Sequence, residues 1–175
     1  MNLIQISKEI RRGNVAPHLL KLWRTLEGVP AGNRIFSHLV GKIVPYSGSV
    51  HPFVLEFAPG RARIRVQDKR ANRNHLGSVH AVALLNVAEL TSGLALLSSL
   101  PPNTRGIVTE LKMEYLKKAK GSITAATQLH GDMKAPTGES GEPVKKWERE
   151  IDCELTDESG AVVAKAVARW RLACN

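Results

Sequence analysis

The sequence is poor in aromatic side chains, and its hydrophobic runs are interrupted by polar residues. Aromatic residues make up 5% of the 175 residues and are not interleaved with the basic ones. This disfavours binding of single-stranded nucleic acid, which relies on bases stacked on aromatic rings. The most apolar stretch, from Val79 to Leu100, contains His80, Asn86 and Glu89. It barely reaches the ~20 residues that a membrane span needs, so we expect no transmembrane helix.

Cysteine is scarce too, and several common site motifs are absent. Cys153 and Cys174 have no metal-ligand spacing with any pair of histidines, and we expect both to be reduced thiols. The sequence has no glycine-rich phosphate loop, no serine-nucleophile elbow and no internal repeat. We therefore expect no metal and no bound cofactor. The amino-terminal residues lack an apolar run after a basic start, which argues against a secretory signal and favours a cytoplasmic protein.

Acidic residues are outnumbered, at 16 against 25 basic ones, which gives a net charge of +9. Such an excess calls for an anionic partner: nucleic acid, a membrane surface or a phosphorylated small molecule. The basic residues are scattered. Arg61, Arg63 and Arg65 alternate along one expected strand, and Lys117, Lys118 and Lys120 cluster in a turn. Because solvated surface is the default for either group, nucleic acid is the least favoured partner.

Hydrophobic periodicity predicts one domain of class α+β. The expected elements are two short helices between about 7 and 39, strands at 53–58 and 61–67, a buried helix at about 79–98, and strands at about 107–115, 123–129, 147–155 and 161–172. A curved antiparallel sheet of five to six strands wrapped around the one long helix satisfies this order with short connections. We treat residues 1–40 as an N-terminal helical extension and residues 41–175 as the core.

Alternation along residues 107–115 assigns one face of that strand to the core. The expected core face carries Ile107, Thr109, Leu111, Met113 and Tyr115, and Val108 lies on the opposite face.

Glu89 is the only charged residue in the predicted buried helix. An ionised carboxylate in apolar surroundings is costly unless it is paired or used. If the helix is central to the fold, burial raises the pKa of Glu89 and makes it a base or nucleophile near neutral pH. The alternative is that Glu89 faces solvent or pairs with an arginine of another strand.

Three further features carry a resemblance to a known family. They are Asn74-x-x-Gly77-x-x-His80-Ala81, the acidic Glu89 nine residues after His80, and Tyr115-Leu-Lys-Lys-Ala119-Lys-Gly121. From about Ile43 to Leu172 the chain resembles the hotdog-fold acyl-CoA thioesterases, in particular the branch related to the phenylacetate-pathway thioesterases. In that family the first motif reads Asn-x-x-Gly-x-x-His-Gly-Gly. Ala81 and Val82 therefore stand where the two glycines would be.

The resemblance implies thioester hydrolysis, with coenzyme A as part of the substrate. Glu89 would be the base or nucleophile, and the Ala81 N–H would stabilise the oxyanion at the helix N-terminus. Asn74 and His80 of a second subunit would hold the thioester and water. Two simpler roles stay open: Asn74 satisfies the turn before the helix, and His80 caps the first helical turn.

The spacing of His80 and Glu89 supports a shared site. Nine steps of about 100° place them on opposite sides of one helix, so a single helix does not bring them together. A two-fold homodimer, or a dimer of dimers, can do so. Asn86, Glu89 and Gly93 form a stripe along which two helices are expected to approach.

Substrate contacts are expected elsewhere too. Gly77, Val82 and Asn86 are candidates around the thioester, and Lys117, Lys118, Arg73 and Arg105 around the CoA phosphates. Several relatives place a Ser or Thr early in the strand after the helix. Here Val108 occupies that position, so the adjacent Thr109 is only a weak candidate.

These departures keep an alternative open, a hotdog protein that binds acyl-CoA or an acyl-carrier protein without cleaving it. Dehydratase or hydratase chemistry on the same fold is less favoured, because the spacing of His and Glu does not match those relatives. A nucleic-acid binder comes last. The sequence leaves the acyl group and the carrier undetermined.

Overall fold

The computed structural model describes residues 16–174. The expected start of the first helix near Ser7 therefore lies outside the described residues. The elements are α2 (Ala16–Leu26), α3 (Gly32–Ile43), α4 (Pro45–Gly48), β1 (Phe53–Ala58), β2 (Arg61–Val66), η1 (Arg70–Asn72), α5 (Ala81–Leu97), β3 (Thr104–Tyr115), β4 (Ile123–Gln128), β5 (Lys146–Thr156) and β6 (Val162–Cys174).

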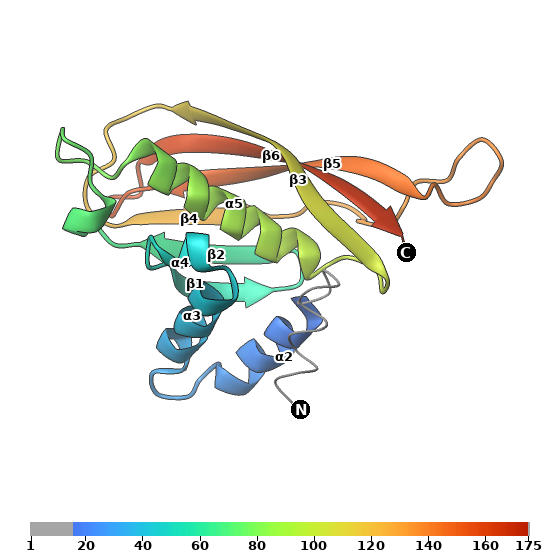
Figure 1. The fold of residues 1–175 in the computed structure, drawn as a ribbon, viewed down its shortest axis with the longest axis horizontal. Coiled ribbons are helices and arrows are strands. Elements are labelled where there is room, and N and C mark those ends of the chain that lie inside the picture. Colours follow the sequence, from blue (N-terminus) through green and yellow to red (C-terminus); the bar gives the residue numbers. More distant parts are fainter. Residues whose placement is uncertain (1–15, 175) are drawn as a thin grey trace.

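The strands form one six-stranded antiparallel sheet in the order β1-β2-β4-β5-β6-β3. Figure 1 shows the sheet curving around α5, with α2 and α3 below β1. This is the α+β arrangement that the sequence predicts. None of the helices within residues 16–174 is long and apolar enough to cross a membrane.

Helix α5 is buried on most of its circumference. Its buried side chains include Leu84, Val87, Leu90 and Leu96, which pack on the inner face of the sheet. Three positions one turn apart, Val82, Leu85 and Glu89, form a strip that stays at least partly exposed. The spacing i, i+3, i+7 aligns them on one helix face. That strip contains the only charged residue of the helix.

The N-terminal helices cover the free edge of the sheet at β1. Trp23 of α2 meets Phe36 of α3 edge to face at 5.0 Å between ring centroids. Val54 of β1 donates its N–H to Ser37 Oγ at 2.8 Å and accepts from Asn33 Nδ2 at 3.3 Å. Helix α3 therefore satisfies backbone groups that an edge strand would otherwise expose.

One expectation about β3 is wrong. Its register with β6 shifts between Val108 and Glu110, which leaves Thr109 as the extra residue of a β-bulge. A bulge reverses which side chains face inward. Val108 consequently turns toward the core and Ile107 is 65% exposed, whereas Leu111 and Met113 point inward as predicted. Thr109 is exposed on the outer face.

Candidate active site

The partly exposed strip of α5 forms one wall of a cleft of about 580 Å³. Helix α5 contributes Val82, Leu85, Asn86 and Glu89 to the lining of this cleft. The opposite walls are the segment from Ile43 to Ser47, which runs from the end of α3 into α4, and Val108 and Leu111 of β3. The bulge at Thr109 is what brings Val108 into this cleft. The walls around Glu89 are thus mostly apolar.

Glu89 is half-buried, and its carboxylate makes no ion pair with any residue in the part of the chain that the structure describes. Burial raises the pKa of Glu89 above its ordinary value. The cause is loss of hydration of the charged form on burial. A carboxylate of this kind is a stronger base than an exposed glutamate. The predicted burial of Glu89 is therefore observed, although the side chain stays partly exposed to the cleft, and no arginine within residues 16–174 pairs with it.

Asn86 lies one helical turn before Glu89 in the same cleft and is buried. Its Nδ2 donates to the Tyr46 carbonyl oxygen at 3.4 Å, which ties α5 to α4. Its Oδ1 is buried and has no hydrogen-bond partner among the residues that the structure describes. Buried polar atoms are nearly always paired, so this acceptor is available to a donor that enters the cleft.

Asn74 organises the turn that precedes α5. Its Oδ1 accepts from Leu76 N–H at 2.9 Å, and from Ser78 N–H and Ser78 Oγ at 3.2 Å each. Gly77 has a φ of 66°, a left-handed conformation that glycine adopts without strain. Asn74 thus has the structural role that the sequence left open. Its Nδ2 makes no hydrogen bond to any residue within 16–174.

His80 is the N-cap of α5, which is the simpler of the two roles that the sequence left open for it. Its Nδ1 accepts from the Val82 N–H at 3.1 Å. Ala81 follows as the first helical residue and is exposed. Its carbonyl oxygen accepts from the Tyr115 hydroxyl at 3.1 Å. No acceptor for the Ala81 N–H occurs among residues 16–174, so this donor is open at the positive end of the helix.

One chain does not bring all the candidates together. The nine residue steps from His80 to Glu89 span about 13.5 Å of helix axis. Val82, Asn86 and Glu89 share the cleft, whereas Asn74, Gly77, His80 and Ala81 do not line it. Thr109 lies outside it as well, with its Oγ1 donating to the Arg169 carbonyl oxygen at 3.3 Å.

The candidates for phosphate contact are dispersed. Lys117 and Lys118 are exposed in the turn after β3, and the Ala119 carbonyl in that turn accepts from the Val79 N–H at 2.9 Å. The turn therefore lies beside the start of α5. Arg73 is engaged in an ion pair with Asp68 at 2.5 Å. Arg105 is exposed on β3.

The interpretation of Gly93 as an approach point for a second helix is wrong. A Cβ added at Gly93 would lie 3.1 Å from the ring of Trp170 on β6. Gly93 therefore faces the chain's own sheet and packs closely against the Trp170 ring. The segment from Ile43 to Ser47 was also missed as a cleft wall. No sequence signal identified it, since its place depends on how α4 packs on α5.

With this geometry established, comparison with known proteins gives the family. Residues 32–172 match the family model described as a domain of unknown function, DUF4442. The chain belongs to this family. No curated protein matches it.

Solved structures resemble this DUF4442 protein over most of its length. The protein PA5026 of Pseudomonas aeruginosa, described as a probable thioesterase, is 27% identical with a TM-score of 0.67, over 79% of this chain and 93% of its own. The protein called APC5556 is 25% identical with a TM-score of 0.70, over 90% and 99%. A thioesterase family protein of Silicibacter pomeroyi, 15% identical, shares the fold with a TM-score of 0.63, over 79% and 96%. The fold is that of the hotdog thioesterases.

Proposed function

We propose that this DUF4442 protein is an acyl-CoA thioesterase whose site is shared across a homodimer. The observation that carries the proposal is Glu89, a carboxyl in an apolar cleft that has a raised pKa and no ion-pair partner within residues 16–174. The description of PA5026 as a probable thioesterase supports the reaction class. We further propose a cytoplasmic location and no cofactor beyond the coenzyme A of the substrate.

In the proposed reaction Glu89 acts as general base. It takes a proton from water while the water oxygen bonds to the thioester carbonyl carbon. The resulting oxyanion accepts the open Ala81 N–H at the helix N-terminus of the second subunit. Collapse breaks the C–S bond, and the thiolate takes the proton back from Glu89. The nucleophilic variant, in which Glu89 forms a mixed anhydride that water then hydrolyses, uses the same groups.

Other residues of the site position the substrate. Asn86 Oδ1 is placed to accept a hydrogen bond from the attacking water or from an amide N–H of the substrate. Val82 contributes apolar surface to the acyl group. The free Asn74 Nδ2 and the His80 ring would meet the thioester from the second subunit, with Gly77 shaping their turn. The turn lysines Lys117 and Lys118 are a candidate contact for the CoA phosphates.

The test is a panel of acyl-CoAs assayed for released thiol with a thiol-reactive dye. A Cys174→Ser background removes the exposed thiol of the protein itself. Glu89→Gln keeps the shape of the side chain but removes the base. We expect it to lower kcat by about 10²-fold to 10⁴-fold on the best substrate. Turnover equal to the parent would remove Glu89 from the mechanism.

A non-catalytic binder of acyl-CoA or acyl-carrier thioesters is the second candidate. It is favoured by Val108 in the cleft, where several relatives have Ser or Thr, and by Ala81 and Val82 in place of two glycines. This candidate would be supported if the protein binds an acyl-CoA but releases no thiol from any member of the panel.

A further inference from the structure

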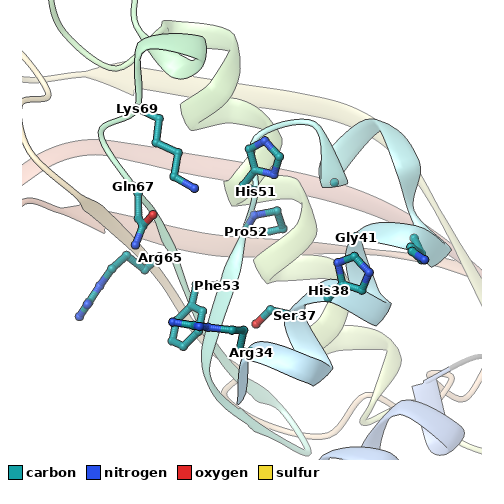
Figure 2. A pocket seen from close by; sticks show the side chains of 12 residues that line it. Arg34, Ser37, His38, Gly41, His51, Pro52, Phe53, Arg65, Gln67 and Lys69 are labelled. Carbon is teal, nitrogen blue, oxygen red and sulfur yellow. The ribbon is translucent and has the colours of Figure 1, made fainter. Parts of the chain in front are cut away.

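A second cavity, of about 700 Å³, lies away from Glu89. Its lining comes from α3, from the loop between α4 and β1, and from β2 with the residues just after it (Figure 2). The lining residues are Arg34, Ser37, His38, Gly41, Lys42, Gly48, His51, Pro52, Phe53, Arg65, Gln67 and Lys69. Its volume suits a small-molecule ligand.

The charged side chains that line this cavity are all basic. Four of its residues, Arg34, Lys42, Arg65 and Lys69, are cationic, two more are histidines, and none is acidic. No ion pair involves any of the four in the part of the chain that the structure describes. Nearby arginines behave differently: Arg61 pairs with Glu56 and Arg73 with Asp68, each at 2.5 Å. The positive potential of the cavity is thus uncompensated, which favours an anionic ligand.

The wall of the cavity is firmly held. His51 adopts a φ of 51°, an unusual conformation for a residue other than glycine, and its N–H donates to the Gly48 carbonyl at 3.0 Å. Asn72 Nδ2 donates to the carbonyls of Val50 at 3.0 Å and Gln67 at 3.1 Å, joining this loop to the end of β2. Backbone strain persists only where surrounding contacts maintain it. In Figure 2 the Lys69 side chain extends toward His51 and Pro52.

We propose that this basic cavity binds the phosphate groups of a small phosphorylated ligand. Arginine and lysine side chains supply the charge-assisted donors that phosphate oxygens require. Nucleic acid fits less well, because Phe53 is the only aromatic side chain among the lining residues and single-strand binding needs successive stacking platforms.

The cavity adjoins the Glu89 cleft along one short segment. Gly41, Lys42 and Gly48 line the cavity, while the intervening residues from Ile43 to Ser47 line the cleft. The phosphates could therefore belong to the CoA end of an acyl-CoA bound at Glu89, a source that rests on the proposed function. The other source is a separate phosphorylated molecule. Both share the same recognition chemistry.

The binding test uses 3′-phosphoadenosine 5′-diphosphate and inorganic pyrophosphate, titrated calorimetrically at fixed ionic strength. We expect Lys42→Gln plus Lys69→Gln to weaken binding at least tenfold. The matched control is Lys145→Gln plus Lys146→Gln, an exposed pair at the start of β5 that does not line the cavity and carries the same charge change. No binding of either probe by the parent protein, or an equal loss of binding in the control, would overturn the proposal.

A kinetic experiment distinguishes the two possible sources of the phosphate groups. If the cavity holds the CoA phosphates, the cavity variant raises KM for acyl-CoA and leaves a pantetheine thioester without phosphates unaffected. If a separate ligand binds there, KM for acyl-CoA stays at the parent value, and Lys117→Ala plus Lys118→Ala raises it instead. Because the probes are titrated without turnover, an inactive protein would refute the thioesterase proposal and leave the cavity test intact.

Discussion

At the scale of single residues, burial of Glu89 makes its carboxylate more basic and also lowers the stability of the fold when the carboxyl is ionised. Its pKa is raised by burial above an ordinary value of 4.5. Between that value and the raised one, the folded protein binds more protons than the unfolded chain. Stability therefore falls as pH rises through this window and stays lower above it.

We expect Glu89→Gln to be more stable than the parent protein at pH 7.5 by a few degrees in Tm, and equal to it at about pH 3, where the parent carboxyl is protonated in both states. Thermal unfolding followed by circular dichroism at the two pH values measures this. Glu139→Gln, in the exposed loop before β5, is the control and should show no such gain. A Glu89→Gln protein less stable than the parent at pH 7.5 would contradict the burial argument.

The two cysteines give a second prediction at this scale. Cys153 is buried on β5, and burial raises the pKa of its thiol to about 11, whereas Cys174 is exposed. Because the thiolate is the reactive form, Cys153 should resist modification. We expect a thiol-reactive dye at pH 8 to label one thiol of the native protein and two after unfolding in guanidinium. Cys174→Ser should remove the native labelling, and rapid labelling of that variant would count against the packing of β5.

At the scale of elements, α5 is held close to β6 by the absence of a side chain at Gly93. The space that a Cβ would need is already bounded by the Trp170 ring, 3.1 Å away. Larger side chains in a well-packed interior force displacement of their neighbours.

We expect Gly93→Val to lower the free energy of unfolding by about 1–3 kcal/mol. Gly93→Ala should cost less, because a single methyl needs only a small shift of the ring and a helix favours alanine over glycine. Urea unfolding of the two variants and the parent gives the order. A Gly93→Val protein as stable as the parent would mean that the helix is not packed against Trp170 as described.

At the scale of the whole molecule, the candidate groups lie at the start and in the middle of one helix, so the proposed reaction needs a second copy of the chain. Asn74 and His80 would belong to one subunit and Glu89 to the other. Each dimer then contains two sites, and each site depends on both chains.

We expect that mixing Glu89→Gln protein with Asn74→Ala protein, each inactive alone, restores about a quarter of parental activity after subunit exchange. Half of the dimers are then mixed, and one of their two sites has both groups intact. Native mass spectrometry of differently tagged chains verifies the exchange. If mixed dimers form and activity stays absent, each site is built within one chain.

Much of the fold follows from short-range pattern. Alternation in Arg61–Val66 predicts its buried and exposed faces, and the apolar run around Glu89 predicts a central helix; both are confirmed. Such patterns relate residues two to four positions apart, so they are readable along the chain. The apolar setting of Glu89 was predictable for the same reason.

Other features depend on contacts between distant segments, and only the tertiary structure decided them. The bulge at Thr109 arises from the register of β3 against β6. It reverses the predicted inward face only for the residues before Thr109, which places Val108 in the same cleft as Glu89. The cleft wall from Ile43 to Ser47 contacts α5, although the two segments are about 40 residues apart in the sequence. The basic cavity is likewise lined by residues of both α3 and β2. Periodicity carries no information on register or on which surfaces meet, because those are set by packing of the whole domain.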